Sequence, residues 1–164
     1  MPTTLENLME AFAGESQANR KYLAFAEQAD KEGHPQVAKL FRAAAAAETV
    51  HAHAHLRAAG KIGDTATNLE EAVAGETHEF KLMYPPMIEQ ARAEGNKVAE
   101  RSLAYANEVE KVHAGLYQKA LDNLGSNAAV DYWVCKVCGH TVENDVPEKC
   151  PICNSAAKAF FKVD

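Results

Sequence analysis

Two segments of the sequence carry the same four-residue pattern, Glu-x-x-His. It spans Glu48 to His51 and occurs again from Glu110 to His113. Residues three apart share one face of a helix, so each pattern can present a carboxylate and an imidazole to one metal ion. A single pattern of this kind is common on solvated helix faces and would indicate little. Whether the two patterns bind metal depends on the residues that surround each copy.

The two patterns belong to a longer internal repeat. Glu48 lies fifteen positions after Gly33, and Glu110 lies fifteen positions after Gly95. Earlier in each half, a Gly-Glu dipeptide lies within a helical stretch. The sequence thus predicts two copies of a helix pair, with one inward Glu on the first helix and Glu-x-x-His on the second. This ligand arrangement is typical of di-iron and di-manganese helix bundles.

The repeat places four carboxylates and two imidazoles around a pair of metal ions. Burying the carboxylates without cations would cost many kcal/mol, and two divalent ions supply the compensating charge. We expect Glu48 and Glu110 to bridge the two ions. The remaining ligands would be Glu15 and His51 on one ion, and Glu76 and His113 on the other.

One carboxylate breaks the symmetry of the repeat. Glu79 follows Glu76 by three residues, whereas the equivalent position in the first half holds Ala18. Glu79 can therefore reach across to the first metal and compete there with His51. A hard carboxylate suits ferric iron and a neutral imidazole suits ferrous iron. We predict that these two side chains exchange as ligands when the oxidation state changes.

Two tyrosines lie about two helical turns beyond the first-helix glutamates, seven residues after Glu15 and eight after Glu76. Tyr22 and Tyr84 could donate hydrogen bonds to the metal-binding carboxylates. They could equally be core aromatic residues whose hydroxyls are satisfied elsewhere.

A second metal site is predicted near the C-terminus. Cys135 and Cys138 form one CxxC pair, and Cys150 and Cys153 form another after eleven intervening residues. Two such pairs are a strong signal for a tetracysteine metal site. Iron and zinc both accept four thiolates, so the residues alone leave the metal open. About 33 residues bury too little core to fold unaided, so the metal also stabilises this module.

The elements that position these residues are four helices and a small C-terminal module. Proline at 85 and 86 must kink or break the third helix near Tyr84. The fold class is an all-α, ferritin-like four-helix bundle followed by a metal-bound module of strands and loops. The expected helices cover residues 4–31, 36–59, 68 onward and 96–123, and the expected domains are 1–125 and 132–164, joined by a linker at 126–131.

Charge and composition exclude some functions. The net charge of −6 offers no basic stripe for a nucleic acid backbone. No run of about 18 apolar residues is present, so we expect no membrane span. CxxC pairs without a recognisable export signal indicate a reducing compartment, and we expect the cytoplasm.

The sequence resembles rubrerythrin over nearly its whole length. The resemblance is carried by Gly14-Glu15-Ser16, the Tyr22 region, Glu48-x-x-His51, Glu76-x-x-Glu79 with Met83-Tyr84-Pro85, Glu110-x-x-His113 and the cysteine pairs. It implies that the seven acidic and histidine residues bind two irons and that Tyr22 and Tyr84 contact the ligands. It also implies a single electron-transfer iron on the four cysteines. The short loop between the second and third helices resembles that of dimers whose protomers exchange helix pairs.

These observations lead us to expect a di-iron peroxidase that reduces hydrogen peroxide to water. Electrons would come from an external reductase or rubredoxin that draws on NADH or NADPH. They would pass through the cysteine-bound iron, facing the di-iron site of a partner subunit in a homodimer. Two alternatives remain: a ferroxidase or iron-handling protein, and a non-enzymatic bundle with a structural zinc ribbon. The same ligands also accept zinc and manganese.

Overall fold

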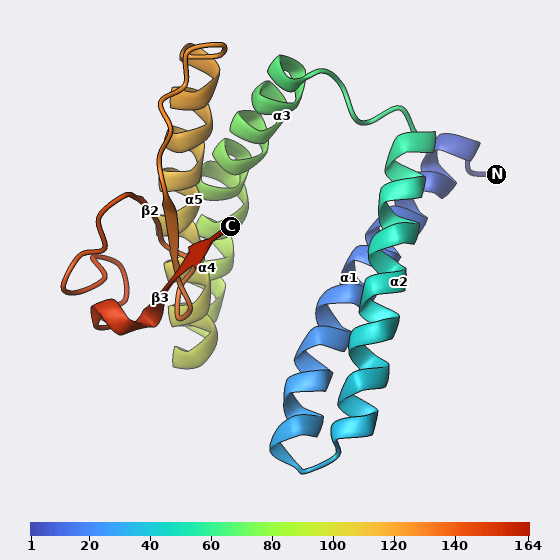
Figure 1. Cartoon of the computed structure of the whole chain (residues 1–164), viewed down its shortest axis with the longest axis horizontal. Helices are drawn as coiled ribbons and strands as arrows, with labels where there is room; N and C mark the ends of the chain where they lie inside the picture. Colours follow the sequence, from blue (N-terminus) through green and yellow to red (C-terminus); the bar gives the residue numbers. More distant parts are fainter. The chain divides into compact units, whose positions relative to one another are not determined.

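The computed structural model describes all 164 residues and shows a mostly helical chain with a small C-terminal sheet (Figure 1). This confirms the predicted fold class. The chain forms two compact units, residues 1–63 and 64–164. None of its helices is both long and apolar enough to cross a membrane. The elements are α1 (Thr4–Lys31), α2 (Pro35–Ala58), α3 (Thr65–His78), η1 (Glu79–Met83), α4 (Tyr84–Ala93), α5 (Lys97–Asp122), β1 (Tyr132–Cys135), β2 (Thr141–Glu143), η2 (Ala157–Ala159) and β3 (Phe160–Val163).

The first unit is a hairpin of two long helices, which lie side by side in Figure 1. A capping box fixes the start of α1: the Thr3 hydroxyl accepts from the Glu6 amide, and the Glu6 carboxylate accepts from the Thr3 amide. The contact between the helices is built on alanines, with Ala26, Ala29 and Ala38 buried beside Phe41. Small side chains at these positions let the two backbones approach closely.

The predicted break at the double proline takes a specific form. Pro85 and Pro86 occupy the first turn of α4, where proline is tolerated. Before them, η1 is a π-helical stretch in which the Tyr84 amide bonds to the Glu79 carbonyl, five residues back. The chain therefore stays helical through this segment and changes locally from α-helical to π-helical hydrogen bonding. The start of α3 at Thr65 is earlier than the expected residue 68, because the Asp64 side chain caps the Thr67 amide.

The turns of the two helix pairs confirm the internal repeat. Gly33 has a φ of 80° and Gly95 a φ of 69°, a conformation that glycine adopts without strain. In each turn, the residue after the glycine bonds back to an alanine carbonyl, His34 to Ala29 at 2.8 Å and Asn96 to Ala91 at 2.9 Å. The same helix-ending motif thus follows the first helix of both pairs.

The C-terminal module belongs to the second unit and packs on α5. Its antiparallel sheet has the order β2-β1-β3. Its core consists of Cys135, Cys150 and Phe160 with Trp133 against them. The module contacts α5 through β2. The domain boundaries at 125/126 and 131/132 stay a prediction.

Candidate metal centres

The first unit brings three predicted ligands together. The Nδ1 atom of His51 lies 2.8 Å from Oε2 of Glu48 and 3.9 Å from Oε1 of Glu15. One ligand atom from each residue lies within 4.8 Å of the others. Glu48 is 17% exposed, whereas His51 is 54% exposed. The donor set of two carboxylates and an imidazole fits a divalent metal.

The second unit repeats this arrangement. The Nδ1 atom of His113 lies 2.7 Å from Oε2 of Glu110 and 4.0 Å from Oε1 of Glu76. Burial raises the pKa of Glu76 to about 7, together with the charges of Glu110 and Glu79. A carboxyl group that resists ionisation among like charges gains from a cation, which replaces its proton. The triad of Glu76, Glu110 and His113 therefore fits a metal ion.

Glu79 and Tyr84 accompany the second triad. Glu79 is the first residue of η1, and π-helical segments often occur at functional sites. Burial raises the pKa of the Tyr84 hydroxyl, and the nearby charges of Glu79 and Glu110 raise it further. Tyr84 thus lies close enough to these carboxylates to feel their charges, and its role as a partner of the ligands stays a prediction.

Tyr22 has different neighbours within its unit. Its ring centroid lies 6.4 Å from that of Phe25 and 6.1 Å from that of Phe41. This is the packing role that the sequence left open as an alternative. The assignment of Tyr22 as a partner of the ligands stays a prediction, as do the ligand assignments themselves.

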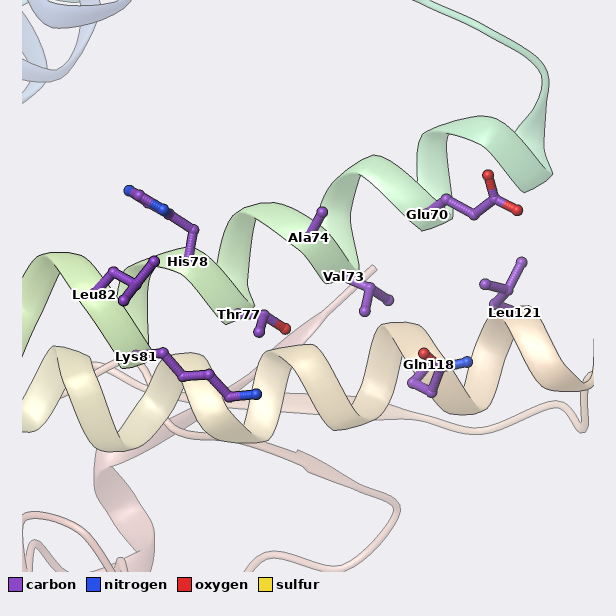
Figure 2. Close-up of a pocket in the computed structure, with 9 residues that line it drawn as sticks. All are labelled: Glu70, Val73, Ala74, Thr77, His78, Lys81, Leu82, Gln118 and Leu121. Atoms are coloured by element: carbon purple, nitrogen blue, oxygen red, sulfur yellow. The ribbon is translucent and has the colours of Figure 1, made fainter.

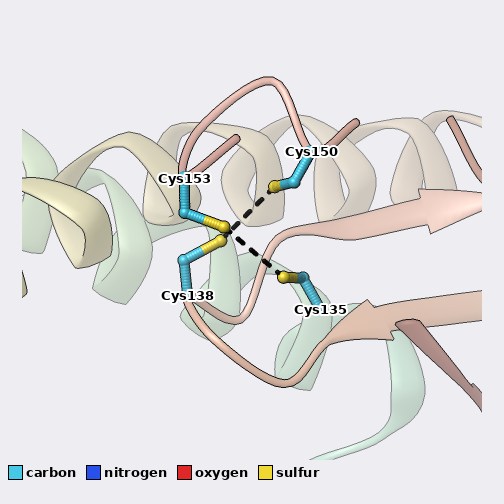
Figure 3. Close-up of side chains that lie close together, drawn as sticks. All are labelled: Cys135, Cys138, Cys150 and Cys153. Atoms are coloured by element: carbon cyan, nitrogen blue, oxygen red, sulfur yellow. Dashed lines mark hydrogen bonds between the residues drawn. The ribbon is translucent and has the colours of Figure 1, made fainter. Parts of the chain in front are cut away.

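The four cysteines converge as expected for a single metal ion (Figure 3). Sγ of Cys135 lies 3.6 Å from Sγ of Cys153, and the sulfurs of Cys138 and Cys150 are also 3.6 Å apart. A disulfide would need about 2 Å. A tetrahedral metal with bonds of about 2.3 Å places its sulfurs about 3.8 Å apart, close to this spacing.

The thiols of this site also require a cation to ionise together. Burial raises the pKa of Cys138 and of Cys150. Burial also acts on Cys153, but hydrogen bonds with Ser155 and the neighbouring thiols outweigh it and lower that pKa to about 6. A bound metal would displace the remaining protons, so the four sulfurs fit the predicted iron.

One contact of the second triad was not predicted from the sequence. The Nε2 atom of His113 lies 2.9 Å from the Thr141 hydroxyl oxygen. Thr141 begins β2, 28 residues further along the chain. No sequence motif connects a threonine of the cysteine module with a helix of the bundle, so only the packing of the module on α5 reveals this contact.

The open groove on the second unit contains no predicted ligand (Figure 2). It runs between the α3–η1 segment and α5. Apolar side chains line much of it, including Val73, Leu82 and Leu121, with Lys81 and Gln118 beside them. The groove is therefore an uncovered apolar surface, separate from the residues that would carry the chemistry.

The fold and the paired triads define a class of helical carboxylate-histidine metalloprotein with an added tetracysteine module. Two family models match the chain: Rubrerythrin over residues 6–121, and the rubredoxin-like domain of rubrerythrin over residues 133–161. The chain therefore belongs to the rubrerythrin family, as its motifs led us to expect.

Individual members of this family are similar to the chain over nearly its full length. Rubrerythrin-2 of Clostridium acetobutylicum is 38% identical, and the alignment covers 96% of this chain and 95% of the relative. Nigerythrin of Nitratidesulfovibrio vulgaris is 36% identical over 92% of this chain and 82% of the relative. The solved structure of fully reduced, all-ferrous nigerythrin is 33% identical, with a TM-score of 0.60, covering 99% of this chain and 88% of nigerythrin.

Proposed function

We propose that this protein reduces hydrogen peroxide to water at a di-iron site. The observation that carries the proposal is the matched pair of Glu/Glu/His triads, on a chain that also holds four converging cysteines. When bound, two ferrous ions supply the two electrons that the O–O bond requires. A tetracysteine iron beside this site serves electron delivery, which neither an iron store nor a structural zinc module requires.

The protein residues around the site hold and orient these ions. Glu48 and Glu110 would hold both ions, and each faces its own histidine, Glu48 with His51 and Glu110 with His113. Glu79 would compete with His51 for one metal position. Tyr84 supplies a hydroxyl among the carboxylates that can donate a hydrogen bond to a ligand or to the substrate.

The cysteine module delivers electrons one at a time from an external donor. That donor is a reductase or a rubredoxin that draws on NADH or NADPH. The module packs on α5 of its own chain, where Lys119 donates to Glu143 at 2.5 Å. It thus lies beside the Glu76, Glu110 and His113 triad. In a dimer with exchanged helix pairs, the partner would complete this site with its own α1 and α2.

The dimer remains a proposal that two features support. Each unit holds only three of the six repeated ligands on its own helices. The helices also leave large apolar side chains exposed, among them Leu40, Val50, Leu82 and Val98. A second protomer would cover such surface. The cytoplasmic location expected from the sequence remains a prediction.

Colour and reoxidation test the function. The purified iron-loaded protein should be red, and dithionite should bleach it as the cysteine-bound iron is reduced. After anaerobic reduction, hydrogen peroxide should restore the colour faster than an equal concentration of dioxygen does. Faster recovery with dioxygen would favour a ferroxidase, and colourless protein with zinc at the cysteines would favour the structural module. Replacing Cys138 with Ser should remove the red colour while the helical circular dichroism remains.

A further inference from the structure

The rubredoxin-like module touches a predicted iron ligand with a side chain. His113 uses both ring nitrogens: Nδ1 faces Glu110 at 2.7 Å, and Nε2 faces the Thr141 hydroxyl at 2.9 Å. Thr141 lies in β2 of the module, whereas the other two residues lie on α5. The main chain also approaches here, because a Cβ added at Gly139 would lie 3.8 Å from Val109. The contact is thus part of a packed interface.

The tautomer of His113 decides the direction of its hydrogen bond with Thr141, whose hydroxyl has a single hydrogen. The Thr141 hydroxyl donates to the Gly139 carbonyl at 3.1 Å. Toward His113 it accepts whenever Nε2 carries the imidazole proton, which is the tautomer that metal binding through Nδ1 requires. The Nδ1 lone pair is then free on the side of Glu76 and Glu110, where a metal ion would bind. Glu110 alone would draw the proton to Nδ1 and block coordination.

The equivalent histidine of the first unit has no such support. His51 contacts Glu48 and Glu15, in both cases through Nδ1. The two halves of the repeat therefore differ at the outer nitrogen of the ring. Ligand histidines are generally oriented by a partner at that nitrogen.

We propose that Thr141 is a positioning residue that holds His113 as a permanent ligand. His51, without this support, is then the histidine that can leave its metal. The module would thereby do more than carry electrons, because its docking sets the orientation and proton position of a ligand in the helical site. The inference rests on the proposed function only in treating His113 as a metal ligand.

Nuclear magnetic resonance of the full-length, zinc-loaded protein tests this inference. Zinc has no redox chemistry and keeps the protein diamagnetic. With 15N-labelled histidine, we expect the Nε2–H of His113 to exchange with water at least about tenfold more slowly than that of His51. Thr141→Ser should preserve this protection, and the isosteric Thr141→Val should abolish it. The matched control Thr49→Val removes a hydroxyl that bonds to a helix carbonyl and should leave the His113 signal unchanged.

Zinc affinity supplies the second readout. Loss of the outer partner of a ligand histidine typically weakens metal binding about 10–100-fold. Thr141→Val should therefore weaken one helical zinc by about this factor, while the cysteine-bound zinc is retained. Equal protection of His51 and His113 in the wild type, or protection that survives in Thr141→Val, would overturn the inference. If protection behaves as expected but the wild type does not reduce peroxide, only the proposed function fails.

Discussion

At the scale of single residues, Glu79 is where the two halves of the repeat diverge. The first half has Ala18 in its place, so the exchange with His51 depends on this one carboxylate. Replacing Glu79 with Gln should lower peroxide turnover about 10–100-fold, since neutral amides bind ferric iron poorly. Iron content should stay unchanged because the two triads are intact. The control is Glu71→Gln, at an exposed site on α3, the helix that directly precedes η1. Wild-type turnover in Glu79→Gln would contradict the exchange.

Glu76 gives the metal-free protein a distinctive dependence on pH. Its folded-state pKa is about 7, above the ordinary value of 4.5, because burial and neighbouring carboxylates oppose its charge. As the pH rises, the Glu76 carboxyl loses its proton near pH 4.5 in the unfolded chain but only near pH 7 in the folded protein. Stability from Glu76 is therefore complete below about 4.5 and is lost between that value and about 7.

Substitution by glutamine isolates this effect. In thermal melts of the metal-free protein, Glu76→Gln and the wild type should unfold at similar temperatures at pH 4.5. At pH 8, Glu76→Gln should unfold at the higher temperature. Metal binding should reverse the order, because the ionised wild-type carboxylate is then a ligand. Parallel curves across this pH range would show that Glu76 is not held among like charges.

At the scale of elements, the paired turns at Gly33 and Gly95 set the length of each helix pair and hence the register of its ligands. The φ of 69° at Gly95 lies in the left-handed region. Gly95→Ala should therefore lower the free energy of unfolding by about 1–2 kcal/mol. As a control, Gly115→Ala lies inside α5 with open space at its Cβ, and it should be neutral or stabilising by up to about 1 kcal/mol. Denaturant unfolding of both variants measures the difference.

The same elements show what the sequence can and cannot predict. Helix ends followed from Gly33, Pro35 and Gly95, because turn chemistry is local. The cysteine cluster followed from its spacing alone. The π-helical form of η1 did not, since two prolines indicate a disturbed helix without specifying how its hydrogen bonds rearrange. Thr141 could not be found either, because its role depends on the docking of two segments far apart in the chain.

At the scale of the whole molecule, the repeat divides the proposed helical site into two sets of three predicted ligands. The set on α1 and α2 belongs to one compact unit, and the set on α3 and α5 to the other. A complete site therefore needs one set of each kind, whether from one chain or from two. This division makes the exchange of helix pairs testable by complementation.

Two inactive variants distinguish the arrangements when they are expressed together. The first variant loses the α1–α2 ligands and the second loses the α3–α5 ligands, so neither can build a complete site alone. The substitutions are E15Q, E48Q and H51N in the first, and E76Q, E110Q and H113N in the second. In a mixed dimer without exchange, each protomer builds its site from its own helices, so both sites combine one intact and one damaged set of ligands. With exchange, the intact sets meet in one site, and the other site receives both damaged sets. We expect mixed dimers, purified through two different affinity tags, to recover about half of the wild-type peroxide turnover and di-iron content. Recovery near zero, in dimers confirmed by mass, would mean that each protomer completes its own site.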